Sequence, residues 1–453
     1  MMRRLGRLAA AAVLACVAGP AAAWTNHTLA AWPALAALPE MKAAPAIKAE
    51  TLETFLAAEA PGLEQLLQRE EAWARAHVAL YPARPDALAF RAGAAPAELR
   101  RRFIAALRIN PNMKLKLFVQ ALPGASTAGE ATLPWAEVTT RRRESAAQDS
   151  VFLQLREGEP VAPLEVVATA TDEPDYGMDI GLWEDNGTAY GRAYGFGKQP
   201  FGNPALEFAS QAPFHMGFFH EHPIVYKAAG FLQRTYPEYR IHLWQSLAVY
   251  ALQTGHAYWG WRFAGWALHY IEDLTQPYHA SVLPGVSVTR LLWISTLDLL
   301  GGHEARKQAI ILVSNRHLAL ENYQYHRMRD AYVRHDESDA LIRAAADLST
   351  DAGRETLSEN SVRELISRES SSLAGATDSV IALSLPAKYV SDPAYVLGET
   401  EPGVDIYRLL EQSPPAAQAA MSGMIGGLLR NFGAYTRAFV RTLLARAQAS
   451  PRR

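Results

Sequence analysis

Histidine and carboxylate side chains with helical spacing lie close together in residues 266–279 of this sequence. His269 and Asp273 are four positions apart, so on a helix they share one face about one turn apart and can converge on one cation. Pro277 disfavours continuation of that helix, and the turn that follows can bring His279 beside the pair. The segment therefore predicts a metal site built from imidazole and carboxylate.

A second pair with the same spacing, His317 and Glu321, lies further along the chain. A single pair of this kind is usually a solvated helix face, but two pairs with a neighbouring histidine favour a centre for several metal ions. Imidazole and carboxylate ligands suit zinc. The HExxH motif of many zinc proteases is absent. Cys16, the single cysteine, excludes a disulfide framework, a cysteine-based zinc ribbon and a CxxC redox site.

The elements that must position these residues are expected to be helices. Apolar residues recur every three to four positions over 47–58, 61–80, 238–255, 257–274, 304–334, 354–369 and 415–448. This pattern predicts an all-α, multi-helix fold. Pro61 and Gly62 separate the first two helices in this prediction.

One long stretch departs from the helical pattern. Residues 102–170 alternate polar with apolar side chains on both sides of a polar link around Arg141, and favour short strands or an extended insertion of unknown role. Residues 172–205 are rich in Gly, Asp, Asn and Pro and predict a loop.

The composition is that of an ordinary globular protein. The 453 residues are 49% hydrophobic and 20% charged, which is enough to bury the core of one large or two smaller domains. The 44 basic and 46 acidic residues give a net charge of −2. A balance so close to neutral does not favour capture of nucleic acid over a broad basic surface.

The first 23 residues have the pattern of a secretory signal peptide. Three arginines precede an apolar run over residues 8–18, and a small-residue site ends at Ala23. The run is too short to span a bilayer. Cleavage would leave Trp24 as the mature N-terminus and shift the net charge from −2 to −5, because three arginines and no acid are removed. The alternative is a lipoprotein acylated at Cys16.

These residues together resemble the zinc-dependent phospholipase C and single-strand nuclease superfamily. Its members are secreted α-helical proteins that hold three zinc ions and hydrolyse phosphodiesters. In this family the α-amino nitrogen and carbonyl oxygen of a mature N-terminal tryptophan bind zinc. The family motifs are matched here by Trp24 and His27, by Asp175 and Tyr176 in a loop, by His215, by His269, Asp273 and His279 around Pro277, and by His317 and Glu321.

The resemblance implies a ligand set for each of three zinc ions. One would be held by Asp175, His215, His269 and Asp273, a second by His279, His317 and Glu321, and a third by the Trp24 terminus, His27 and Asp273. Asp175 is also implied as the group that orients or deprotonates an attacking water. His220 lies close enough to His215 in the sequence to be the alternative ligand.

The other histidines are interpreted without a metal. His242 and His256 lie among aromatic residues and are expected to be structural. The expected surface histidines are His77, His303, His326 and His335. Trp259, Trp261 and Trp266 fall at helical spacing and are expected to be core or pocket wall rather than a platform for stacking bases.

The predicted function is a secreted or periplasmic zinc-dependent phosphodiester hydrolase over residues 24–453, with an insertion at about 102–170. A phospholipase C acting on glycerophospholipids at a membrane surface is favoured over a single-strand nuclease because the mature chain is slightly acidic. The apolar stretch from Met421 to Leu429 could also contact lipid, although core packing is the simpler use of it. A non-catalytic exported zinc-binding protein is the alternative of a different class. No stable protein partner is implied.

Overall fold

The computed structural model describes residues 24–141, 149–202, 208–398 and 400–449. Helix makes up 61% of the structure and strand 3%, which confirms the predicted all-α class. The predicted signal peptide, with Cys16, lies outside the described residues, as does part of the polar link after Arg141. Among the described helices, none combines the length and the hydropathy needed to cross a bilayer.

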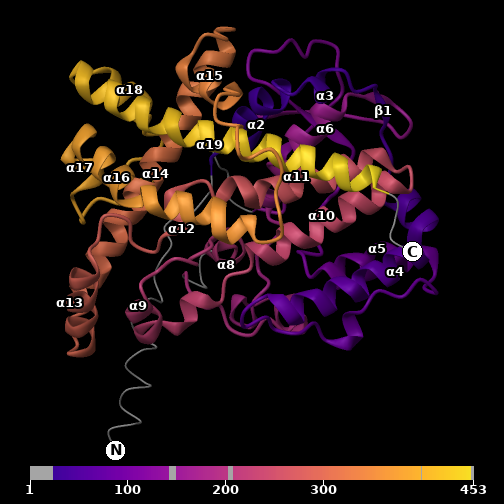
Figure 1. Cartoon of the computed structure of the whole chain (residues 1–453), viewed down its shortest axis with the longest axis horizontal. Helices are drawn as coiled ribbons and strands as arrows, with labels where there is room; N and C mark the ends of the chain where they lie inside the picture. Colours follow the sequence, from indigo (N-terminus) through magenta and orange to yellow (C-terminus); the bar gives the residue numbers. More distant parts are fainter. Residues whose placement is uncertain (1–23, 142–148, 203–207, 399, 450–453) are drawn as a thin grey trace, which may run out of the picture.

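The helices follow one another with mostly short links (Figure 1). The longer helices are α2 (His27–Ala36), α4 (Leu52–His77), α5 (Pro96–Leu107), α6 (Pro163–Ala170), α10 (Pro237–Gln253), α11 (Ala257–Asp273), α13 (Val288–Leu299), α14 (Glu304–Val333), α15 (Ala340–Ala346), α16 (Arg368–Ser384) and α19 (Pro415–Gln448). The short helices are α3 (Pro39–Lys42), α7 (Ala189–Tyr194), α8 (Ala212–His215), α9 (Pro223–Ala228), α12 (Pro277–Ala280), α17 (Ala387–Val390) and α18 (Ile406–Glu411).

Tighter and wider helical turns connect these helices. The 3₁₀ turns are η1 (Asp86–Leu88), η2 (Trp135–Glu137), η4 (Glu173–Tyr176), η5 (Glu184–Asn186), η6 (Phe208–Ser210) and η7 (Gly230–Gln233). A π-helical turn, η8 (Val362–Ser367), leads directly into α16.

Two small antiparallel sheets take four of their five strands from the stretch predicted to be extended, residues 102–170, and the fifth from residues 47–48, which were predicted to be helical. One has the order β2-β4-β3, from β2 (Phe118–Ala121), β4 (Val151–Gln154) and β3 (Thr132–Leu133), and the other pairs β1 (Ile47–Lys48) with β5 (Pro160–Val161). Phe118, Val138, Phe152 and Tyr176 form a small apolar core on the first sheet. The prediction of short strands is thus confirmed for the middle of residues 102–170, whereas both ends are helical, in α5 and α6.

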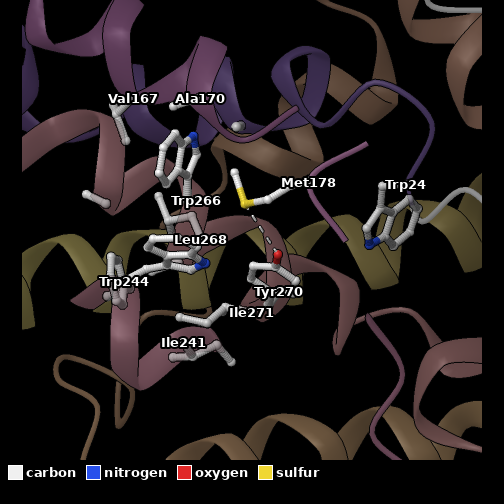
Figure 2. Packing of buried hydrophobic residues seen from close by; sticks show 14 of the residues in the cluster. Trp24, Val167, Ala170, Met178, Ile241, Trp244, Trp266, Leu268, Tyr270 and Ile271 are labelled. Atoms are coloured by element: carbon white, nitrogen blue, oxygen red, sulfur yellow. Dashed lines mark hydrogen bonds between the residues drawn. The ribbon is translucent and has the colours of Figure 1, made fainter. Parts of the chain in front are cut away.

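Helix α11 is the centre of the fold. All of its residues from Tyr258 to Asp273 are buried, and it packs against α10, α6 and α19 (Figure 1). Trp266 lies edge-on to Trp244 of α10 with ring centroids 4.8 Å apart (Figure 2). A Cβ on Gly265 would lie 2.4 Å from the Cβ of Ala170, so this glycine lets α6 approach α11 closely. That approach places the end of α6 beside the last turns of α11.

The turn after α11 forms as the sequence indicates. α11 ends at Asp273, and Pro277 occupies the first turn of α12, where a missing backbone N–H costs nothing. The side chain of Gln276 caps α12 by accepting a hydrogen bond from the backbone N–H of Tyr278 at 2.7 Å. His279 therefore lies on a short helix that turns back beside α11.

The predicted break at Pro61 and Gly62 is wrong, because α4 continues through both. Buried leucines before and after the proline, including Leu56 and Leu63, keep the same face in the core, so packing offsets the lost backbone hydrogen bond. The glycine is required by a close contact: a Cβ on it would lie 1.8 Å from the hydroxyl of Tyr250. The helix begins at Leu52 rather than at 47, after a Thr51 cap.

Two other boundaries differ from prediction. The helix expected over 354–369 starts only at Val362, because the segment before it is held as a turn by side chains, among them Thr442, which accepts the backbone N–H of Leu357 at 2.7 Å. The loop expected over 172–205 contains short helical turns (η4, η5 and α7) between its glycines. The most important of these is η4, which carries Asp175.

Candidate metal centre

The residues predicted to bind metal come from six helical segments that meet at the end of α11. α11 supplies His269 and Asp273, and α12 supplies His279. The others are His27 at the start of α2, Asp175 in η4, His215 at the end of α8, and His317 with Glu321 in α14. All of them are buried.

The pair on α11 has the geometry that its spacing predicts. His269 Nε2 lies 3.4 Å from Asp273 Oδ2. The other ring nitrogen, Nδ1, lies 2.6 Å from the backbone carbonyl of Thr171, just after α6. Because a carbonyl can only accept, Nδ1 carries the proton and Nε2 keeps its lone pair toward the aspartate. Such an acceptor behind a histidine is typical of a metal ligand.

His27 is held in the same manner. Its Nδ1 lies 2.9 Å from Glu272 Oε2, and its Nε2 lies 3.3 Å from Asp273 Oδ1. Thr436 of α19 donates a hydrogen bond of 2.9 Å to the other oxygen of Glu272. Two consecutive residues of α11 therefore have different roles. Glu272 orients the imidazole of His27, and Asp273 faces the centre.

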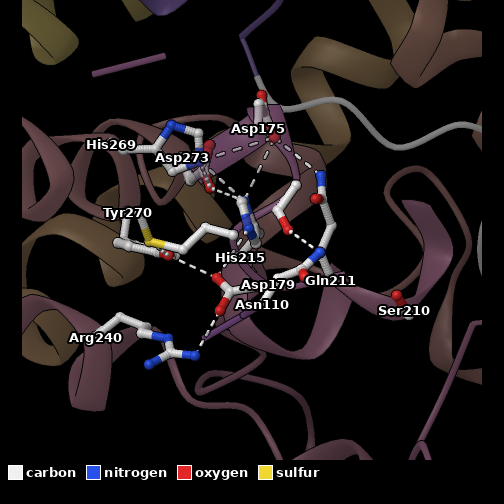
Figure 3. Close-up of polar contacts among 12 residues, drawn as sticks. Asn110, Asp175, Asp179, Ser210, Gln211, His215, Arg240, His269, Tyr270 and Asp273 are labelled. Atoms are coloured by element: carbon white, nitrogen blue, oxygen red, sulfur yellow. Dashed lines mark hydrogen bonds and ion pairs between the residues drawn. The ribbon is translucent and has the colours of Figure 1, made fainter. Parts of the chain in front are cut away.

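His215 lies between carboxylates (Figure 3). Its Nδ1 is 2.9 Å from Asp273 Oδ2 and 3.9 Å from Asp175 Oδ1. Its Nε2 lies 3.4 Å from Asp179 Oδ2. Nδ1 thus points to the centre, and Nε2 points to an aspartate on the opposite side.

Asp179 is itself fixed by two donors. Arg240 Nη2 lies 2.5 Å from its Oδ1, and the hydroxyl of Tyr270 donates to its Oδ2 at 2.6 Å (Figure 3). The charge of the buried arginine, together with His215, holds the pKa of Asp179 below its usual value although burial alone would raise it.

A second set of side chains adjoins the first through α12. His279 Nδ1 lies 3.1 Å from the backbone carbonyl of His215, which leaves Nε2 free to face α14. There His317 Nε2 lies 2.6 Å from Glu321 Oε1. Gln276 donates a hydrogen bond of 3.1 Å to the same oxygen, and the ring of Tyr278 stacks on His317 with centroids 5.2 Å apart.

Three groups in the described residues bring ligand atoms within 4.8 Å of one another. They are His27, His269 and Asp273; Asp175, His215 and His269; and His279, His317 and Glu321. Several of their polar atoms are buried without a hydrogen-bond partner: Nε2 of His27, His215, His279 and His317, both carboxylate oxygens of Asp273, and Oε2 of Glu321. Leaving one such atom unpaired costs about 1–3 kcal/mol. Buried histidine and carboxylate groups that converge in this way can bind a metal ion.

The protonation of the cluster reflects its crowding. Burial alone would lower the pKa of His215, but the carboxylates of Asp179 and Asp273 beside its two ring nitrogens, with the charge of Asp175 nearby, raise it to about 10. The surrounding histidine rings hold the pKa of Asp273 well below its usual value against the opposing effect of burial. Burial and the charges of Asp175 and Asp273 raise the pKa of Glu321. Protons thus compensate the charges that a cation would balance.

The structure brings His215 into the centre and places His220 outside it. His220 Nε2 lies 2.7 Å from the backbone carbonyl of Arg363 and belongs to none of the three groups. Trp24 is fully buried, and its indole N–H lies 3.0 Å from the carbonyl of Glu272 and 3.2 Å from the hydroxyl of Thr275.

The remaining histidines have contacts of their own or lie at the surface. His242 Nδ1 lies 2.7 Å from Glu70, and His256 Nδ1 lies 2.8 Å from Glu50. His326 is only partly exposed and lies 3.4 Å from Asp405. The exposed histidines are His77, His222, His303 and His335.

Sequence reasoning missed the residues behind the ligands. Glu272 and Asp179 each lie behind a ligand histidine. Asp172 accepts a hydrogen bond of 2.8 Å from Thr28 next to His27, and burial raises its pKa to about 6. Their signal in the sequence is weak, because an acidic residue beside a ligand or in an acidic turn is common on solvated surfaces.

A hollow of about 310 Å³ between α10 and the start of η8 lies apart from the centre. Its lining includes Trp73, His242 and Arg363, and it contains none of the residues in the three groups. The candidate site is therefore identified by its chemistry and not by the size of a cavity.

Comparisons of this chain with family models, with curated proteins and with solved structures found no match.

Proposed function

We propose that the protein is a zinc-dependent phosphodiester hydrolase of the phospholipase C kind, acting on glycerophospholipids. The observation that carries this proposal is the convergence of buried, unpartnered imidazole and carboxylate atoms around both oxygens of Asp273. Nitrogen and oxygen ligands at a ratio of about one to one, without thiolate, suit zinc in a hydrolytic site.

Three zinc ions fit the ligand atoms in number. The assignments are Asp175, His215, His269 and Asp273 for the first, His279, His317 and Glu321 for the second, and His27, Asp273 and the Trp24 terminus for the third. The oriented ring nitrogens support this set, since four of the histidines have an acceptor behind the nitrogen that faces away. Asp273 would then belong to the ligand sets of two ions.

Bound zinc would supply Lewis-acid stabilisation of the phosphoryl oxygens and make a water acidic enough to ionise near neutral pH. The protein would supply the placement of the metal ions and the substrate. Asp175 is 8% exposed and His317 6%, whereas His27, His215, His269, Asp273 and His279 are at most 2% exposed. Asp175 and His317 are therefore the assigned ligands nearest to solvent, and substrate would approach next to them.

Asp175 is suited to receive the proton of the attacking water. Gln211 donates a hydrogen bond of 2.9 Å to its Oδ1 and so fixes the plane of the carboxylate (Figure 3). A carboxylate held at the more exposed edge of the centre can accept a proton and pass it to solvent.

Export and cleavage before Trp24 belong to the same proposal. The chain would be released to the periplasm or the exterior, with acylation at Cys16 as the alternative. The indole of Trp24 is anchored to the end of α11 by Glu272 and Thr275. This anchor supports a role for Trp24 next to the centre. Its freed α-amino group would there complete the ligand set of the third zinc ion.

A direct experiment combines metal analysis with two substrates. Purified mature protein is expected to contain close to three zinc equivalents and to hydrolyse phosphatidylcholine in a chelator-sensitive manner, more efficiently than single-stranded DNA. Asp175→Asn should abolish most of the hydrolysis and weaken only the zinc equivalent to which Asp175 is assigned. Fewer than two zinc equivalents would refute the proposal, and efficient cleavage of DNA alone would replace phospholipase by nuclease.

A further inference from the structure

The insertion sheet (β2, β3 and β4) contributes no ligand, yet it is joined to the metal centre by one buried side chain. Gln120 of β2 is 4% exposed and lies opposite Phe152 of β4. Its side-chain oxygen, its side-chain nitrogen and its backbone N–H each have a partner in a segment that carries or contacts a candidate ligand. These contacts point to a role for the insertion that the sequence pattern did not reveal.

The side-chain carbonyl of Gln120 faces the Asp175 segment. The hydroxyl of Tyr176 donates to Gln120 Oε1 at 2.5 Å. Tyr176 directly follows Asp175 in η4, and its ring is packed in the small core of the sheet beside Phe152. The position of the Asp175 carboxylate is thereby tied to the sheet.

The side-chain amide of Gln120 faces the His27 segment. Its Nε2 donates to Asn26 Oδ1 at 3.1 Å, and Asn26 Nδ2 donates in turn to Ser150, just before β4, at 3.2 Å. Asn26 directly precedes His27 and caps α2 in the left-handed region, with φ 58°. Asparagine tolerates this conformation better than most residues. The cap therefore sets the backbone direction at the start of α2 and, with it, the direction of the His27 side chain.

The backbone of Gln120 reaches a third segment. Its N–H donates to Thr169 Oγ1 at 2.7 Å near the end of α6. Two residues further on, the carbonyl of Thr171 accepts the hydrogen bond of His269 Nδ1. One residue of the insertion thus contacts segments that lead to His27, Asp175 and His269.

We infer that Gln120 is a positioning residue through which the insertion sheet holds the Asp175 and His27 segments at the spacing that the metal ions require. The carbonyl oxygen and the NH2 of the one side-chain amide contact Tyr176 and Asn26 and so fix the distance between them, and the packed sheet fixes the glutamine. The group of His279, His317 and Glu321 has no contact with this network in the described residues. The effect of the insertion is therefore local to one side of the centre.

The test compares isosteric variants in the full mature chain. Gln120→Met removes both side-chain hydrogen bonds at nearly constant volume. Gln120→Glu keeps the acceptor for Tyr176 and places a second acceptor against Asn26 Oδ1. Gln154→Met is the matched control, because Gln154 is an exposed glutamine of β4 in the same sheet.

The readout is zinc binding, measured by competition with a chromophoric chelator, beside thermal unfolding of the metal-free and zinc-loaded proteins. Gln120→Met is expected to weaken two of the three zinc equivalents by about 10- to 100-fold, as is usual for groups behind ligands. The third equivalent and the Gln154→Met control should match the wild type. Gln120→Glu should weaken the equivalent that depends on His27 more than the one that depends on Asp175.

A purely structural role for Gln120 would lower the unfolding temperatures of the metal-free and loaded proteins equally and leave zinc affinity unchanged, and that result would overturn the inference. The inference rests on the proposed zinc centre, but the two fail differently. Wild-type protein that takes up no zinc refutes the proposed function. Wild-type and Gln120→Met proteins that bind three ions with equal affinity refute only the role of Gln120.

Discussion

Two regions of the molecule bring histidine and carboxylate together, and they differ in what is left unpaired. Around α4 and α10, His242 pairs with Glu70 and stacks on Trp73, with ring centroids 3.5 Å apart. His256 has a carboxylate at each ring nitrogen, Glu50 at 2.8 Å and Glu59 at 3.3 Å. These pairs are complete without a cation.

The centre at the end of α11 has the same residue types in a different arrangement. There several of the atoms that face the centre have no hydrogen-bond partner, among them Nε2 of His27 and of His279. Both oxygens of Asp273 are buried and without a hydrogen bond, although histidine nitrogens surround them. The comparison teaches that unpaired atoms converging on one point, and not the number of histidines, distinguish the candidate metal centre.

The strongest test of this contrast compares zinc binding in the Asp273→Asn and Glu70→Gln variants. The first change removes a carboxylate that faces His27, His215 and His269. Zinc binding at the two groups that meet there is expected to weaken by more than about 100-fold, beyond the usual effect of residues behind ligands. Metal analysis after gel filtration would show the loss. Glu70→Gln should keep the full zinc content, and equal losses in both variants would remove the distinction between the regions.

Glu321→Gln addresses the other side of the centre. One zinc equivalent is expected to be lost, while those that depend on Asp273 remain. Since burial and neighbouring carboxylates raise the pKa of Glu321, a neutral glutamine should leave the metal-free protein as stable as the wild type or more so. Calorimetry of the metal-free variants measures this stability. Loss of all three equivalents would show that the two sides cannot load independently.

The helical part of the centre was predictable, because spacing alone fixes which residues share a face. His269 and Asp273 belong to this class, as do His317 and Glu321. The choice of His215 over His220 depends on how α8 packs against α11, which no local pattern records. His27, the partner of Glu272, is 245 residues away in the chain. The role of Glu272 could therefore be found only in the folded protein.

The break predicted at Pro61 shows the same limit for the fold. A proline signal is local, and the packing of α4 outweighs it. The glycine beside it has a different cause, because it leaves room for the hydroxyl of Tyr250. Local signals of this kind indicate that a position is special without saying whether a turn or a close contact is the cause.

Glu272→Gln sharpens the comparison at a residue behind a ligand. Glutamine keeps the volume and an acceptor, but it loses the charge that faces His27 Nδ1 and can offer the ring a donor instead. Zinc that depends on His27 is expected to bind about 10- to 100-fold more weakly. The d–d spectrum of the cobalt-substituted protein should change for that site alone. An unchanged affinity would mean that Thr436 and Glu272 serve only to anchor α19.

The pH dependence of zinc binding separates the regions further. The pKa of His215 is raised to about 10 in the metal-free protein, so its ring is protonated at pH 7 and zinc must displace that proton. Affinity is therefore expected to rise with pH, by about tenfold per unit for each proton displaced between pH 6 and 8. Calorimetric titrations in buffers of different ionisation enthalpy would count the protons released. Binding without proton release would show that His215 is not a ligand.

The smallest effect on metal is expected for His242→Asn, and this makes it the most specific test of the contrast. The change removes an imidazole that is paired with Glu70 and stacked on Trp73, so it should cost about 1–2 kcal/mol of folding stability. It should alter zinc content and affinity by less than about twofold, because the ring has no unpaired atom directed at another ligand. Denaturant unfolding and chelator competition on the same sample give both values. A loss of zinc at constant stability would reverse the assignment, since it would place a metal site in the region whose pairs are complete.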